Sequence, residues 1–329
     1  MIYYFLLYTH FIVKSYKALL YAIINTFYIN IFLYKNRIKR INSYRHAYNF
    51  INKYLTLTLY SHKKDNMKIA IIGAGNMGGA VAAGLAKGKL VQSRDIICTA
   101  RTQATLDKIK AIDPEIIVTK DNSYAVKEAD IIILAVKPWL MQDVIADIRE
   151  FFDPFNHTFV SVAAGITLEE LCSWICPASP SSVSVFRAIP NTAAAVLSSM
   201  TFISSVNAHD DEIKLVCDIF DEMGTTMYVE ERLIPAGTAL ASCGIAFAMR
   251  YIRAASEGGV EIGFRPEEAR MIVEYTVKGA AELLLASGNN PEVEIDKVTT
   301  AGGITIKGLN EMEHEGFSSA VIKGLKACL

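Results

Sequence analysis

The sequence has little net charge and few cysteines, and both features exclude classes of protein. Its 33 Lys+Arg and 34 Asp+Glu give a formal net charge of −1, whereas a nucleic-acid-binding protein carries a strong basic excess. None of the 6 Cys forms a Cys-x-x-Cys pair or has a His at metal-ligand spacing. We therefore expect no metal site, no disulfide scaffold and no nucleic-acid partner, and a cytoplasmic protein with reduced thiols.

Glycine and proline are absent from the beginning of the chain. Residues 1–66 hold none of the 20 Gly and none of the 9 Pro, but they contain 11 of the 15 Tyr and a single acid, Asp65. Residues 18–34 carry no charge and precede Lys35, so a membrane anchor is one interpretation. We favour another, in which residues 1–66 are a non-native extension and the working protein begins at Met67.

A glycine motif follows the first apolar run of the remaining chain. Residues 67–72 (MKIAII) are rich in Ile like a buried parallel strand, and Gly73, Gly75 and Gly78 form a G-x-G-x-x-G pattern before the Ala-rich segment 79–87. In this setting the first glycine makes a tight turn, the second lets the backbone approach a pyrophosphate, and the third lets helix and strand pack closely. The phosphates then face the free N–H groups of the helix N-terminus. The pattern predicts a dinucleotide-binding domain.

The residue that distinguishes the two nicotinamide cofactors is expected after the second strand, residues 95–99. An NAD site has Asp or Glu there to accept a hydrogen bond from the ribose 2′-hydroxyl. This chain has no acid at that place and carries Arg101 instead, which can pair with a 2′-phosphate. We therefore predict NADP(H) as the cofactor, with NAD(H) as the alternative.

Strand-like and helical segments alternate as far as residue 229. The expected strands are 116–118, 131–136, 159–163, 183–188, 201–205 and 225–229, and the expected helices are 123–129, 140–151, 168–175 and 210–222. Such alternation is typical of an α/β protein with a doubly wound, mostly parallel sheet. We therefore expect a Rossmann domain over residues 67–229.

The strand signals stop after Pro235, and the rest of the chain is expected to be helical. Residues 233–249 carry no charge, but they contain proline and glycine, which favours a helix buried between subunits or domains over a membrane span. A second helix should run from Pro266 to just before Gly288, where apolar residues recur at helical spacing. The stretch 298–305, rich in Thr and Gly, offers backbone N–H groups and hydroxyls to an anion such as a carboxylate.

Five motifs, in order, resemble those of the pyrroline-5-carboxylate reductase family. They are Ile72–Met77 (IGAGNM), Ala135–Pro138 (AVKP), Ser161–Gly165 (SVAAG), Arg187–Thr192 (RAIPNT) and Asp296–Thr305 (DKVTTAGGIT). The resemblance runs from Met67 to the C-terminus. It implies a reductase that uses NADPH to convert the cyclic imine 1-pyrroline-5-carboxylate into L-proline, the last step of proline biosynthesis. It also implies a homodimer formed through C-terminal helices, with residues 230–329 as a substrate and dimerisation domain.

The resemblance also assigns candidate site residues. The cofactor would contact Ile72, Gly73, Ala74, Gly75, Asn76, Met77, Arg101, Asn122, Ala135, Val136, Lys137, Pro138, Ala163, Ala164 and Gly165. The substrate would contact Asp296, Val298, Thr300, Gly302 and Gly303. The candidate catalytic residue is Thr305, whose hydroxyl would orient the ring nitrogen. Because the imine is readily protonated, we expect positioning to matter more than a strong protein acid.

Two departures from the family pattern lie close to these motifs. The family usually has Pro where this chain has Ala301, and Gly-Pro where it has Gly244 and Ile245. Each exchange could loosen its loop or helix, although neither removes a polar group.

Two other interpretations remain open from the sequence. Gly303, Lys307 and Asn310 form a G-x-x-x-K-x-x-N pattern similar to that of β-hydroxyacid dehydrogenases. In those enzymes the lysine lies on the long helix that leaves the sheet domain, whereas here it lies far beyond the last expected strand. The other interpretation is a membrane-tethered nucleotide-binding protein without catalysis, with its tether in residues 1–66.

Overall fold

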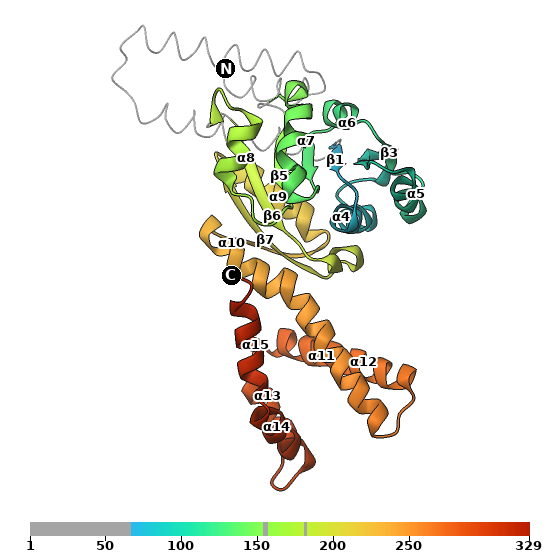
Figure 1. Ribbon diagram of the computed structural model, residues 1–329, viewed down its shortest axis with the longest axis vertical. Helices are drawn as coiled ribbons and strands as arrows, with labels where there is room; N and C mark the ends of the chain where they lie inside the picture. The colour runs from blue at the N-terminus through green and yellow to red at the C-terminus, as the bar shows by residue number, and fades with distance from the viewer. Residues whose placement is uncertain (1–66, 154–156, 181–182) are drawn as a thin grey trace, which may run out of the picture. The chain divides into compact units, whose positions relative to one another are not determined.

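One sheet of eight strands organises the first part of the described chain, in the order β3-β2-β1-β4-β5-β6-β7-β8 (Figure 1). The computed structural model describes residues 67–153, 157–180 and 183–329, so both interpretations of residues 1–66 lie outside the described residues. The strands are β1 (Ile69–Ile72), β2 (Ile96–Thr99), β3 (Ile117–Thr119), β4 (Ile131–Leu134), β5 (Thr158–Ser161), β6 (Val185–Ile189), β7 (Ser199–Val206) and β8 (Gly224–Tyr228). Among them the β6–β7 pair is antiparallel and every other pair is parallel.

Helices connect these strands, which confirms the doubly wound α/β fold expected from the sequence. They are α4 (Asn76–Lys87), α5 (Gln103–Ile112), α6 (Asn122–Glu128), α7 (Met141–Ile148), α8 (Leu168–Ile175) and α9 (Asp210–Asp221). Short 3-10 turns add η1 (Ser93–Asp95), η2 (Pro138–Leu140), η3 (Arg149–Phe151) and η5 (Thr192–Val196).

Several boundaries differ from the sequence-based expectation. Helix α4 begins at Asn76 rather than at residue 79, so the last part of the glycine motif forms the first helical turn. The expected helix 140–151 is divided, because the chain tightens into η2 before α7 and into η3 after it. Helix α5 was not expected; its buried residues are only Leu106 and Ile109, too few to give a clear apolar stripe.

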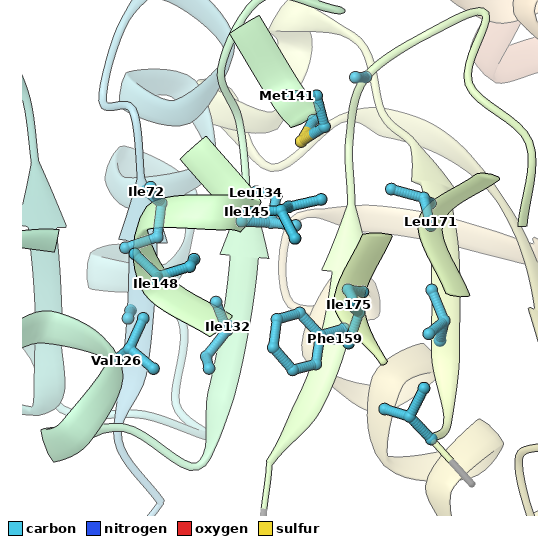
Figure 2. Packing of buried hydrophobic residues seen from close by; sticks show 14 of the residues in the cluster. Ile72, Val126, Ile132, Leu134, Met141, Ile145, Ile148, Phe159, Leu171 and Ile175 are labelled. Carbon is cyan, nitrogen blue, oxygen red and sulfur yellow. The ribbon is translucent and has the colours of Figure 1, made fainter. Parts of the chain in front are cut away.

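The hydrophobic core between the sheet and helices α6, α7 and α8 fixes the central strands in place. Alternate residues of the strands face one layer of helices, and Figure 2 shows Ile72, Ile132, Leu134 and Phe159 of the sheet packed among residues of α6, α7 and α8. These strand residues are at most 1% exposed. Complete burial of one such side chain stabilises the fold by roughly 1.5–3 kcal/mol, so the strand ends are held by the most strongly stabilised part of the molecule.

The chain after β8 is helical, as expected. Its elements are η6 (Glu231–Leu233), α10 (Ile234–Gly237), the π-helical segment η7 (Thr238–Cys243), α11 (Gly244–Glu261), α12 (Pro266–Ser287), α13 (Pro291–Val298), α14 (Ile304–His314) and α15 (Phe317–Lys326). Gly237 allows α10 to approach the sheet, because a Cβ atom there would lie 2.6 Å from Cγ of Phe202 on β7. The hydroxyl of Ser242 then donates to the carbonyl of Pro190 at 3.0 Å, which ties η7 to the loop after β6.

Helix α11 presents apolar side chains to solvent in the described chain. None of its residues is buried, and Phe247, Met249 and Tyr251 are exposed. Of the expected interface segment 233–249, Ile234 and Ala239 are buried within the single chain, whereas Phe247 and Met249 are exposed, so burial of the segment between subunits stays a prediction. Within the described residues, one helical stretch, Glu231–Glu261, contains a window that is long and apolar enough to cross a membrane, judged by length and composition alone. Ile245, where the family has Pro, is the second residue of α11 and follows directly on the π-helical segment η7.

Candidate functional site

The three glycines of the first motif occupy three different environments. Gly73 has φ +95°, and a Cβ atom there would lie 2.7 Å from Cγ1 of Val136. Gly78 packs so closely that a Cβ atom would collide with the carbonyl of Gly73 and lie 3.1 Å from Cβ of Ala135. Gly75, in contrast, has no atom within 4 Å of its Cβ position and is exposed. The turn therefore needs two glycines for its own geometry, and the third leaves open space in which a ligand can approach the backbone.

The N-terminus of α4 is suited to an anion, whereas that of α8 already carries carboxylates. The N-cap of α4 is Gly75, which supplies no capping side chain, and the first turn contains no acid. Helix α8 starts with a capping box between Thr167 and Glu170, and the N–H of Leu168 donates to Oε1 of Glu231. Free N–H groups and the helix dipole favour negative charge at the first helix. The residues after β1 therefore fit the pyrophosphate of a dinucleotide.

The end of β2 holds this turn in place. Thr99, which is 1% exposed, accepts hydrogen bonds from the N–H of Gly73 at its hydroxyl (3.2 Å) and from the N–H of Ala74 at its carbonyl (2.7 Å). Since Thr99 pairs with the last residue of β1, the chain leaves β2 beside the glycine turn. Arg101 follows two residues later and is exposed. Its pairing with the 2′-phosphate of a cofactor stays a prediction, with which an exposed position after β2 is compatible.

The other predicted cofactor residues lie at the same edge of the sheet. Strands β4 and β5 are parallel to β1, so the segments that follow them, 135–138 and 163–165, come together beside the glycine turn. The N–H of Ala135 donates to the carbonyl of Ile72 at 2.9 Å, and the N–H of Ala163 donates to Oγ of Ser161 at 3.3 Å. Asn122 is the first residue of α6, after the neighbouring strand β3. One edge therefore carries all the predicted cofactor segments.

Trp139 is a candidate contact residue that the sequence-based predictions omit. It follows Pro138 directly, its side chain is 75% exposed, and Nζ of Lys137 lies 5.9 Å from the centre of its ring. A tryptophan immediately after a cofactor motif is the signal that could have identified it, because tryptophan is enriched at binding surfaces, where its ring is covered and its N–H finds a partner.

The predicted substrate residues lie on α13, on α14 and in the loop between them. Asp296 and Val298 belong to α13, and Thr305 is the second residue of α14 rather than part of the loop. In the loop Gly302 has φ +70°, and the N–H of Gly303 donates to the carbonyl of Thr300 at 2.9 Å. Gly303 caps α14 without a side chain, so this helix also begins with free N–H groups.

Within one chain these two groups of residues are not joined. Among the described residues, no hydrogen bond or ion pair links the segment 296–305 to the cofactor edge. Thr300, Thr305 and Lys307 are all exposed. We call the predicted residues of the cofactor edge the cofactor half-site and the predicted residues within 296–305 the substrate half-site. The geometry of the single chain does not by itself bring them together.

Comparison with known proteins identifies the family. Residues 231–329 match the family described as pyrroline-5-carboxylate reductase dimerisation, and residues 68–165 match the one described as NADP oxidoreductase, coenzyme F420-dependent. Pyrroline-5-carboxylate reductase 1 of Dictyostelium discoideum is 40% identical over 269 residues, 78% of this chain and 48% of that protein. The chain thus spans about half the length of this relative.

Two further comparisons cover nearly the whole of the matched protein. Pyrroline-5-carboxylate reductase 2 of Dictyostelium discoideum is 37% identical over 277 residues, 80% of this chain and 91% of that protein. A crystal structure of Plasmodium falciparum pyrroline carboxylate reductase with NADP bound has a TM-score of 0.71, 24% identity, and covers 80% of this chain and 95% of its own, which supports the fold. The chain belongs to the pyrroline-5-carboxylate reductase family of NAD(P)-dependent oxidoreductases.

Proposed function

We propose that this protein reduces the cyclic imine 1-pyrroline-5-carboxylate to L-proline with NADPH. The observation that carries the proposal is the match over 91% of a relative named for this reaction. Two features of the chain support it: a phosphate-receptive glycine turn, and a loop rich in hydroxyl and N–H groups within the matched C-terminal region. The β-hydroxyacid dehydrogenase alternative is not favoured, since the curated relatives and the family that matches residues 231–329 are named for pyrroline-5-carboxylate reductase.

In the cofactor half-site, the segments that follow different strands would bind different parts of NADPH. The N–H groups at the start of α4 would bind the pyrophosphate, and Arg101 would pair with the 2′-phosphate that distinguishes NADPH from NADH. The segments 135–138 and 163–165 would hold the nicotinamide end, because they follow β4 and β5 at the same edge. When bound, the nicotinamide supplies the hydride.

The substrate half-site would act by orientation. The backbone N–H groups near Gly302 and Gly303 would bind the substrate carboxylate, and the N-terminus of α14 adds a favourable dipole. Oγ1 of Thr305 would hold the ring nitrogen by a hydrogen bond and fix the face of the imine carbon. Hydride transfer needs that carbon about 3–3.5 Å from the hydride donor. A hydroxyl is a weak acid, so its role is geometric.

The two half-sites would meet in a dimer. The exposed apolar side chains of α11 provide a surface that a second subunit could cover, and the dimerisation family matches this region. In this arrangement the loop 299–303 of one subunit faces the cofactor edge of the other, so an isolated monomer is inactive. We also propose that the dimer is soluble and cytoplasmic.

A subunit-mixing experiment tests the shared site. Gly75→Asp places a negative charge where the pyrophosphate should lie, in open space that tolerates a side chain, and Thr305→Ala disables the other half-site. If the sites are shared between subunits, a mixed dimer regains one intact site, and random exchange gives about a quarter of the wild-type rate. Mixtures with no more activity than either variant alone would exclude shared sites.

The activity itself is tested by following NADPH oxidation. The purified chain should oxidise NADPH in the presence of pyrroline-5-carboxylate. It should not reduce NADP in the presence of short β-hydroxyacids. Absence of imine reduction in a folded dimer would overturn the proposed function.

A further inference from the structure

Glu231 joins three parts of the chain at a single carboxylate oxygen. Its Oε1 accepts a hydrogen bond from Nη1 of Arg187 at 2.8 Å and another from the backbone N–H of Leu168 at 2.7 Å. Arg187 lies on β6, Leu168 is the first residue of α8, and Glu231 is the first residue of η6, where the helical region begins. The sheet, the helix after the 163–165 segment and the entry to the helical region therefore share one acceptor.

The arginine in this cluster depends on Glu231 for its charge balance. The side chain of Arg187 is 6% exposed, and among the described residues its Nε atom has no hydrogen-bond partner. A buried guanidinium without a counter-charge is strongly unfavourable. Glu231, whose side chain is 35% exposed, is consequently held in one orientation by a residue fixed in the core.

The same carboxylate fixes one end of the cofactor segment 163–165. The N–H of Leu168 has no acceptor within helix α8 and donates to Glu231 instead. The N–H groups of Thr167 and Glu170 are satisfied within the capping box that these two residues form. At the other end, the N–H of Ala163 donates to Oγ of the buried Ser161. Between these anchors Gly165 has φ +81°, so the segment is a short turn held at both ends.

We propose that Glu231 is a positioning residue for the segment 163–165 and couples it to the helical region that carries the substrate half-site. The proposal rests on the proposed function in one respect, namely that this segment holds the nicotinamide. Loss of the anchor should change the distance between nicotinamide and imine and lower kcat. NADPH affinity should change little, because the glycine turn and Arg101 follow β1 and β2, whereas the segment 163–165 follows β5.

Two double variants separate positioning from charge balance. Arg187→Met with Glu231→Gln removes both charges and keeps an oxygen that can accept from Leu168, whereas Arg187→Met with Glu231→Met removes both charges and the acceptor. Neither leaves a buried charge, so both should fold, and their melting temperatures are compared first. The acceptor-free double variant should show kcat lowered on the order of tenfold, with the dissociation constant of NADPH within about twofold of wild type. The variant with Gln should recover most of kcat.

A second readout does not require turnover. Amide hydrogen exchange of residues 164–168 should be faster in the acceptor-free double variant than in the one with Gln. The control is Lys68→Met with Glu128→Gln, which removes an ion pair of 3.0 Å at the opposite end of β1 and should alter neither kcat nor this exchange.

The outcomes distinguish this proposal from the proposed function. Equal kcat and equal amide exchange in the two double variants would overturn the role of Glu231 while leaving the activity intact. If the wild-type chain does not reduce the imine, the proposed function fails. Amide exchange of residues 164–168 in the two double variants, measured with and without NADPH, still decides whether Glu231 anchors the segment.

Discussion

The hydroxyl of Thr99 accepts a hydrogen bond from the backbone N–H of Gly73 at 3.2 Å, and this contact ties the end of β2 to the glycine turn. Thr99 is 1% exposed, so no water can replace its oxygen. Thr99→Val keeps the shape and leaves the N–H of Gly73 without a partner. We expect a loss of roughly 1–3 kcal/mol in the free energy of unfolding, measured by urea denaturation, and weaker NADPH binding.

The control for this prediction is Thr99→Ser. It keeps the oxygen and loses one methyl group, which costs about 0.8 kcal/mol of burial, so NADPH binding should be retained. If the Val and Ser variants bind NADPH equally well, the hydrogen bond to Gly73 does not shape the turn.

Two glycines of the motif should respond differently to the same substitution. Gly78→Ala brings a Cβ atom against the carbonyl of Gly73, so we expect a lower melting temperature as well as weaker NADPH binding. Gly75→Ala meets no atom within 4 Å, so its effect on the melting temperature of the apoprotein should be limited to the poorer N-cap and smaller than that of Gly78→Ala. It should still raise the dissociation constant of NADPH, because the added methyl occupies the space of the pyrophosphate. Equal effects on stability would contradict the separate roles.

The sequence predicted the central strands well because β1, β2, β4 and β5 are short, mostly apolar and buried on both faces. The segments 131–136 and 159–163 were recognised for this reason, and only their last residues proved to be loop. Helix α13 was missed because it is mostly exposed, and its signals reduce to Asn290 as a cap and Pro291 at its start. The two hydrogen bonds of Glu231 were beyond prediction, since they join it to residues 44 and 63 positions away in the chain.

For the site as for the fold, local features were predicted from the sequence and long-range ones were not. The glycine turn and Arg101 were predicted from local patterns, and the other cofactor residues were assigned by the resemblance to the family. Assembly of the complete site depends on how exposed helices such as α11 meet another surface, and no local sequence pattern determines that geometry. The same limit explains why Thr305 was assigned to a loop: Gly303 supplies no capping side chain that would mark the start of α14.

Arg101 should determine the preference between the two cofactors. Arg101→Asp replaces a partner of the 2′-phosphate by an acid that repels it and can accept from a ribose hydroxyl. One charge-assisted contact is worth about 1.5–3 kcal/mol, so we expect roughly a tenfold to hundredfold rise in the KM for NADPH. The KM for NADH should change much less. Steady-state kinetics with both cofactors make the comparison, and equal losses would remove Arg101 from the site.

Acid should weaken the start of α8 through Glu170. A hydrogen bond from the backbone N–H of Thr167, and a second from its hydroxyl, lower the pKa of the Glu170 carboxyl below its usual value of 4.5. A lowered pKa in the folded state means that the ionised group stabilises the fold above its unfolded-state pKa, and this contribution is lost as pH falls through the folded-state pKa.

The variant Glu170→Gln isolates this contribution. Wild type should be more stable than the variant at neutral pH, and the difference should shrink as the pH falls below about 4.5. Urea denaturation of both proteins at several pH values measures it. A difference that stays constant down to about pH 3 would show that ionisation of Glu170 does not stabilise the helix.

The last prediction concerns the two threonines of the proposed substrate half-site. Thr305→Ala removes one hydroxyl and leaves the backbone donors of the loop and the cofactor edge in place. NADPH affinity should survive, while kcat should fall on the order of 10²-fold, since a misplaced ring nitrogen moves the imine carbon away from the hydride. Thr305→Ser restores the oxygen and should recover most of the activity.

Thr300→Ala should behave differently, because a contact to the substrate carboxylate exists equally in the ground state and the transition state. Its main effect should be a higher KM for pyrroline-5-carboxylate with a smaller change in kcat. The contrast between the two variants is the decisive measurement, since a general disturbance of the loop 299–303 would change both constants in both proteins. If Thr305→Ala leaves kcat and KM unchanged in a folded dimer, the assignment of Thr305 is wrong, and Lys307, two residues further along α14, becomes the residue to test.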